Sequence, residues 1–136
     1  MSNMTMQAIR AHDYGDPEVL MLEQAPRPEP KADEVLIRVK AAGVNPADWK
    51  MRAGLYKGFM ELPFPWTPGL EAAGIVEAVG ANVITLKKGD EVYGIVAGAY
   101  AEYALALEND VQLKPAGLTF EQAAALPMGV LTAWGP

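Results

Sequence analysis

Prolines and glycines are spaced so closely along this chain that a long helix has nowhere to form. The 136 residues include 11 prolines and 13 glycines, and a proline inside a helix removes one hydrogen bond and clashes with the preceding turn. Such spacing favours short strands joined by turns over a helical bundle. Because 51% of the residues are apolar, we still expect one globular domain with a modest core.

The ionisable and metal-binding residues exclude several classes of protein. The net charge is -6 and the basic residues are scattered, so nucleic acid is not an expected partner. There is no cysteine and only one histidine, His12, which excludes disulfides, thiolate metal sites and clustered imidazole ligands. The N-terminus lacks the apolar core of a signal peptide, and the longest uncharged stretch, residues 123–136, is too short to span a bilayer. We therefore expect a soluble, cytoplasmic protein.

Period-two alternation predicts the strands. It is most regular in EVLIRVKAAGVN, which predicts a strand with one face partly wet. There Val35, Ile37 and Val39 alternate with Leu36, Arg38 and Lys40. Two further strands are expected on either side of Gly98, joined by a hairpin or a tight corner. The other strands are expected in residues 6–14, 18–26 and 70–80, and a short strand closed by a turn in residues 111–117.

Two short helices have recognisable ends. Pro46 suits a first helical position and Gly54 suits a stop. Thr119 begins a capping box with Gln122, and this helix should end before Pro127. Between them, residues 55–69 form a long loop, and loops of this length in compact domains are often functional.

Four ordered blocks carry a family resemblance: GVNPADWKMRAG, PFPWTPGLEAAGIVEAVG, KKGDEVYG and FEQAAALPMGVLTAW. Together, from about Ala8 to Trp134, they resemble the medium-chain dehydrogenase/reductase superfamily, and most closely its zinc-independent quinone oxidoreductase branch. The resemblance implies a mainly β, GroES-like, partly open barrel with two or three short helices over residues 1–126. Residues 127–136 would begin the helix that connects to a Rossmann cofactor domain, which is absent here because no G-x-G-x-x-G occurs.

The resemblance also bears on zinc. Zinc-dependent relatives carry metal ligands at the positions of Asn45, Leu70 and Met128, and a hydroxyl for the proton relay at Ala47. A carboxamide, a hydrocarbon and a thioether cannot replace thiolate and imidazole ligands. We therefore expect no metal and no alcohol dehydrogenase activity, which requires a Lewis acid and a proton acceptor.

Hydride transfer to a quinone or activated enone depends less on general acid–base catalysis than alcohol oxidation does. This is the activity that the resemblance implies, with NADP(H) as cofactor. In that assignment Asn45 is the catalytic residue and contacts the nicotinamide or the acceptor carbonyl. Thr132 contacts the nicotinamide, and Trp49 and Tyr56 line the acceptor pocket. Each has a plainer alternative: Asn45 as a turn or helix cap, Trp49 as core, Tyr56 as a loop residue and Thr132 as an ordinary helix residue. Asp48 and Glu71 are expected to be structural.

Other functions stay open from the sequence. A 2-alkenal or enoyl reductase would share the same hydride chemistry. A non-catalytic GroES-like binding or assembly module belongs to a different class, and unpaired strand edges and apolar surface would favour a homo-oligomer. We expect the isolated chain to be inactive. The preference for NADPH over NADH comes from the resemblance alone.

Overall fold

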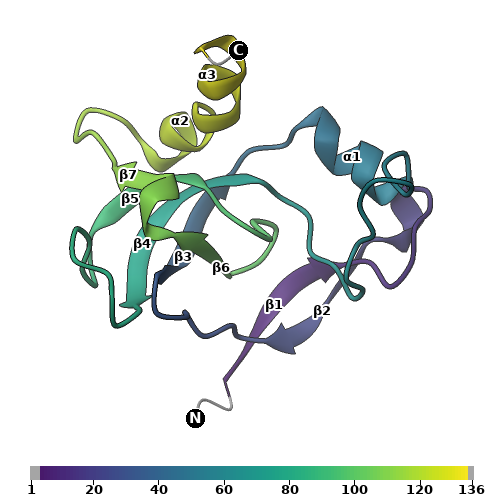
Figure 1. Cartoon of the computed structure of the whole chain (residues 1–136), viewed down its shortest axis with the longest axis horizontal. Coiled ribbons are helices and arrows are strands. Elements are labelled where there is room, and N and C mark those ends of the chain that lie inside the picture. Colours follow the sequence, from purple (N-terminus) through teal and green to yellow (C-terminus); the bar gives the residue numbers. More distant parts are fainter. Residues whose placement is uncertain (1–3, 135–136) are drawn as a thin grey trace.

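The computed structural model describes residues 4–134, and in this range it shows a mainly β molecule with three short α-helices (Figure 1). None of these helices is long and apolar enough to cross a membrane. The strands are β1 (Thr5–Arg10), β2 (Met21–Pro26), β3 (Glu34–Ala42), β4 (Glu71–Val79), β5 (Glu91–Ile95), β6 (Tyr103–Leu107) and β7 (Val111–Leu113). The helices are α1 (Pro46–Arg52), α2 (Phe120–Ala124) and α3 (Pro127–Trp134), with 3-10 turns at Pro17–Val19 and Glu108–Asp110.

Five strands form one antiparallel sheet in the order β6-β3-β4-β5-β7, and β1 pairs with β2 in a separate ribbon. The sheet curls, and the ribbon lies across its open side (Figure 1). Backbone hydrogen bonds attach the ribbon, from the N–H of Ile9 to the carbonyl of Tyr100 (2.8 Å) and between Ala11 and Trp66 (2.9 Å). The predicted fold, a partly open barrel with two or three short helices, is confirmed.

The main core lies inside the curl of the sheet. Its largest fully buried side chains are Val35 and Ile37 of β3, Val76 of β4 and Val92 of β5. Each contributes about 1.5–3 kcal/mol by leaving water. These side chains come from three adjacent strands. The inward-facing residues of one strand are therefore buried only because the neighbouring strands place apolar residues on the same face of the sheet.

The face of β3 that was expected to be partly wet is less exposed than predicted. Arg38 is half-buried and Lys40 is exposed, but Leu36 is buried. Leu36 borders an open cavity of about 370 Å³ together with Arg27, Pro28 and Pro30. The proline-rich connector between β2 and β3 therefore covers this end of the outer face, since extended proline segments can cross a sheet without pairing with it.

The predicted capping box at Thr119 is confirmed. The hydroxyl of Thr119 accepts from the N–H of Gln122, and the side chain of Gln122 accepts from the N–H of Thr119, both at 3.0 Å. Helix α2 packs Ala123 and Ala124 against Ala73 of β4 and ends, as predicted, before Pro127. Helix α3 begins at Pro127, so α2 and α3 lie together at one end of the sheet (Figure 1).

The segment around Gly98 is a corner and not a hairpin. Strand β5 pairs with β4 and β7, whereas β6 pairs with β3 on the far side of the sheet. A single bridge between Ala97 and Leu105 joins the two arms. The corner carries the chain from β5 to β6, the edge strand on the opposite side of the sheet. It places Tyr100 beside the start of α1, where the candidate site lies.

Gly74 allows β3 and β4 to approach closely, and we predict that Gly74→Ala destabilises the fold. A Cβ at this position would overlap the backbone carbonyl of Arg38 and the side chain of Ile37. Because backbone in a paired strand cannot move aside, the free energy of unfolding should fall by about 1–3 kcal/mol. Urea unfolding measures this. Gly117→Ala, which adds a methyl group where no atom lies within 4 Å, is the control, and an equal loss in both variants would contradict the prediction.

Candidate functional site

Asn45 occupies the cap position at the start of α1. The residue is extended (φ -127°, ψ 154°) and is followed by Pro46 at the first helical position, as the sequence predicts. The carboxylate of Asp48 accepts a hydrogen bond from the backbone N–H of Asn45 (2.9 Å). The N–H of Asp48 donates to the backbone carbonyl of Asn45 (3.0 Å) and also faces the side chain of Asn45, which gives this helix start a capping box. The nitrogen of the Asn45 amide is thus left for another partner.

Asp48 connects three segments through its buried carboxylate. Besides Asn45, it accepts from the N–H of Gly69 (3.1 Å) at the end of the long loop and from the hydroxyl of Tyr100 (2.9 Å) in the corner. The structural role expected for Asp48 is confirmed. A buried carboxylate requires such donors, because an unpaired one costs several kcal/mol.

Tyr100 is a member of this site that the sequence did not reveal. Burial raises its pKa, and the hydrogen bond donated to Asp48 and the negative charges of Asp48 and Glu71 raise it further. Its hydroxyl therefore stays protonated and directed at Asp48. Tyr100 lies 52 residues from Asp48 in the chain, and its position among other strand aromatics carries no signal of the contact.

Glu71, at the start of β4, is only 3% exposed. Its carboxylate accepts from the side-chain amide of Asn45 (2.7 Å) and from the backbone N–H of Met128 in the first turn of α3 (3.0 Å). A Cβ on Gly43 would overlap this carboxylate, so glycine provides the space that the carboxylate occupies. These contacts agree with the structural role expected for Glu71.

A cavity of about 160 Å³ opens beside α1. It contains Asn45 and Trp49, two of the four predicted site residues, and Trp49 is 48% exposed at its edge. The full lining is Leu20, Val44, Asn45, Asp48, Trp49, Arg52, Pro68 and Tyr100. The cavity thus combines apolar walls with an amide, a phenol, the carboxylate of Asp48 and the guanidinium of Arg52, and a mainly apolar lining with a few polar groups is typical of a small-ligand site.

The other two predicted residues do not line this cavity. Tyr56 is half-buried in the turns that follow α1, where its carbonyl accepts from the N–H groups of Phe59 and Met60. Thr132 is exposed on α3. The four residues are therefore not one cluster within the described chain, and a ligand that touched all of them would have to extend from α1 to α3.

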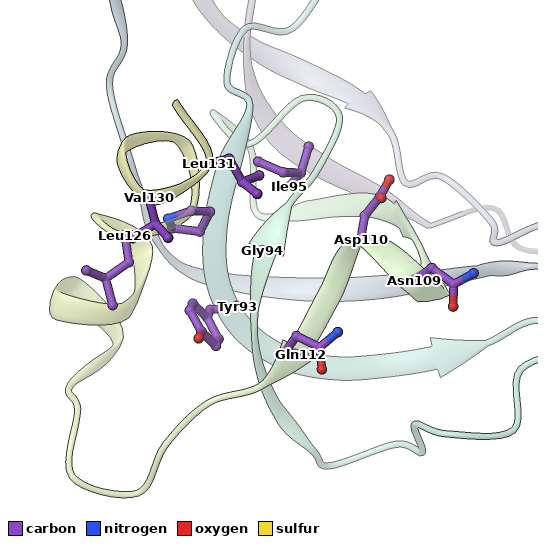
Figure 2. A pocket seen from close by; sticks show the side chains of 10 residues that line it. Tyr93, Gly94, Ile95, Asn109, Asp110, Gln112, Leu126, Val130 and Leu131 are labelled. Carbon is purple, nitrogen blue, oxygen red and sulfur yellow. The ribbon is translucent and has the colours of Figure 1, made fainter. Parts of the chain in front are cut away.

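A larger cavity, of about 340 Å³, lies beneath α3. Figure 2 shows Val130 and Leu131 of α3 facing Tyr93 and Ile95 of β5 across it, with Asp110 and Gln112 along one side. None of the four predicted site residues lines it. Its apolar lining and its place at the sheet edge indicate a packing surface more than a catalytic site.

The residues at the former metal positions do not suit a metal ion. Asn45 and the backbone of Met128 both direct N–H groups at Glu71. An N–H group offers no lone pair to a cation, and the carboxamide, hydrocarbon and thioether at these positions are not the thiolate or imidazole ligands that zinc prefers. Within residues 4–134, no group of three or more His, Cys, Asp or Glu side chains gathers. The absence of zinc stays a prediction.

The curled antiparallel sheet and the short helix α1, whose cap residue Asn45 bonds to the buried Glu71, define a GroES-like domain. The chain belongs to the alcohol dehydrogenase GroES-like domain family, whose sequence model matches residues 31–116. It is 47% identical over 131 residues to the quinone oxidoreductase of Sus scrofa. It is 43% identical over 139 residues to the chloroplastic NADPH-dependent alkenal/one oxidoreductase of Arabidopsis thaliana. These matches confirm the predicted resemblance.

The solved structures agree with this assignment. The quinone oxidoreductase of Escherichia coli complexed with NADPH superposes with a TM-score of 0.85 at 34% identity, over 96% of this chain and 39% of that one. The chain spans 39% of the Sus scrofa protein and 36% of the Arabidopsis protein, while 94% of this chain is covered in each comparison. The similarity therefore concerns the GroES-like part of these longer proteins.

Tyr100 should ionise well above the pH at which free tyrosine does. Because its folded pKa is raised, the stability contributed by the neutral phenol is fully present below the unfolded pKa of about 10 and is lost as the pH rises through the folded value. Phenolate absorbance of the wild type minus that of Tyr100→Phe isolates this group. About one pH unit above the midpoint of free tyrosine, we expect Tyr100 still to be protonated and to give no phenolate absorbance. If Tyr100 ionised at the same pH as free tyrosine, this result would contradict the hydrogen bond to Asp48.

Proposed function

We propose that this chain is the N-terminal, acceptor-binding domain of a zinc-independent, NADPH-dependent oxidoreductase that transfers hydride to quinones or activated enones. One observation carries the proposal: 94% of the chain matches a quinone oxidoreductase at 47% identity. The hydrogen bond from Asn45 to Glu71, at a position expected for a metal ligand, supports its zinc-independent part. An alkenal/one oxidoreductase among the relatives supports enones as the second acceptor class. The family alone does not decide between the two acceptors.

In this proposal the cavity beside α1 holds the flat ring or enone of the acceptor. Trp49 provides an aromatic wall, Val44 and Pro68 provide apolar contacts, and Asn45 provides the polar contact beside the reacting atoms. Tyr56 would extend the wall from the loop after α1. Tyr100, with its proton directed at Asp48, maintains the shape of the cavity and does not act as an acid.

The nicotinamide, when bound, supplies the hydride. Asn45 and Thr132 are the residues of this chain that would contact it, from the cap of α1 and from α3. We propose that residues 1–126 form the catalytic domain and that residues 127–136 begin the connection to the residues that hold most of NADPH. In support, the 136 residues contain no G-x-G-x-x-G, which the Rossmann mode of pyrophosphate binding needs. The 136 residues alone should then be inactive.

The test is NADPH oxidation by the whole protein that contains this chain, with a quinone or a 2-alkenal as acceptor. We expect turnover that neither added zinc nor a chelator changes. Asn45→Ala should lower kcat/KM by about tenfold or more, the effect of one lost hydrogen bond at the reacting centre. Ile84→Ala, an exposed change in the turn between β4 and β5, serves as the control. Alcohol oxidation that depends on zinc would overturn the proposal.

A non-catalytic assembly module is the second candidate, and the surface of α3 favours it. Val130, Leu131 and Trp134 of α3 are exposed, although they are large and apolar. Together with the cavity beneath the helix, they form an apolar surface of the kind that mediates association. A homo-oligomer built through α3 would cover this surface.

If α3 mediates self-association, the chain should sediment as a dimer or larger species at high concentration. Leu131→Glu, which places a charge at a side chain that is 56% exposed, should return it to a monomer. The matched control is Ile84→Glu, because Ile84 is 88% exposed but lies away from α3, and it should leave association unchanged. A wild-type chain that stays monomeric in sedimentation velocity experiments would contradict this proposal.

A further inference from the structure

The contact between Asn45 and Glu71 determines how the amide of Asn45 is oriented. The group that lies 2.7 Å from Oε2 of Glu71 is the amide nitrogen, the end of the amide from which a carboxylate can accept a hydrogen bond. The amide oxygen then faces the N–H of Asp48 in the capping box at the start of α1. Since Asn45 also lines the cavity beside α1, this contact fixes the orientation of a polar group in the cavity wall.

The same carboxylate also holds α3. Its second oxygen accepts from the N–H of Met128 (3.0 Å), one of the free donors in the first turn of a helix. Thr132 follows Met128 by one helical turn and therefore lies on the same side of α3. One buried carboxylate thus joins the two residues that the proposed function places at the nicotinamide, Asn45 through its side chain and Thr132 through its helix.

The surroundings of Glu71 support this arrangement over a simple charge pair. No lysine, arginine or histidine of residues 4–134 forms an ion pair with Glu71. A Cβ on Gly43 would overlap the carboxylate. Burial without a cation leaves the two N–H donors as the groups that stabilise the charge, so the carboxylate cannot rotate without losing one of them.

We propose that Glu71 is a positioning residue that orients the amide of Asn45, with its nitrogen directed inward, and ties it to the first turn of α3. Without the carboxylate, the nitrogen of the amide loses its acceptor, and the two nearly isosteric orientations of the amide become closer in energy. The catalytic part of this proposal rests on the proposed function; the orientation of the amide does not.

The orientation can be tested on this chain by NMR of the side-chain amides. One Nδ2 proton of Asn45 should be shifted downfield from its position in the unfolded chain, because it bonds to a carboxylate. In Glu71→Gln that shift should be lost. Asn82, whose Nδ2 donates to Asp33 at 3.1 Å on the surface, is the internal control and should not change. Wild-type Asn45 signals at their unfolded positions, or Asn45 signals that Glu71→Gln leaves unchanged, would overturn the proposal.

The catalytic consequence needs the whole protein with NADPH and a quinone. Glu71→Gln should lower kcat by roughly ten- to hundredfold and change KM for the quinone by less than about threefold. If Glu71 acts through Asn45, adding Glu71→Gln to Asn45→Ala should cause little further loss. An equal loss in both backgrounds would assign Glu71 to holding α3 alone and overturn the positioning role. A wild type without NADPH oxidation would defeat the proposed function, while the amide signals still decide the orientation of Asn45.

Discussion

The structure depends on two buried carboxylates, Asp48 and Glu71, that are satisfied by N–H and O–H donors and not by cations of the described chain. Removing a carboxylate from water costs several kcal/mol unless it is paired or hydrogen-bonded. The donors come from the cap of α1, the end of the long loop, the corner at Tyr100 and the first turn of α3. These four segments must therefore be in place together, and this requirement fixes the end of the barrel where the cavity lies.

The long loop between α1 and β4 shows how this constraint works on irregular chain. Residues 55–69 contain too much proline and glycine for a strand or helix, yet they are anchored at several points. The hydroxyl of Tyr14 accepts from the N–H of Leu62 (3.0 Å), its ring packs edge-on against Phe64 (4.8 Å between centroids), and Trp66 pairs with Ala11. Asp48 holds the far end of the loop through Gly69. One wall of the cavity is thus held in shape without regular secondary structure, which favours binding of a rigid, flat ligand.

The sequence predicted part of the candidate site. The motif around Asn45 and its resemblance to a known family led to Asn45 and Trp49, and the structure places both at one cavity. The motif did not show that Thr132 lies on a separate, exposed helix face, or that Tyr100 belongs to the cavity. The roles of these residues toward a cofactor or acceptor stay predictions. Motifs list residues that are neighbours along the chain, whereas a cavity is formed by residues that strand pairing brings together.

By itself, the sequence determined the local structure: the β3 strand from its alternation, the start of α1 at Pro46, and the capping box at Thr119. These features depend on interactions within a few residues, and patterning, proline geometry and side-chain capping express them directly. Only the tertiary structure decided that Tyr100 bonds to Asp48 across 52 residues and that Glu71 bonds to Met128 across 57. Such contacts follow from the register of β3 with β4 and β6 and from the corner that moves the chain between sheet edges, and no local pattern specifies these arrangements.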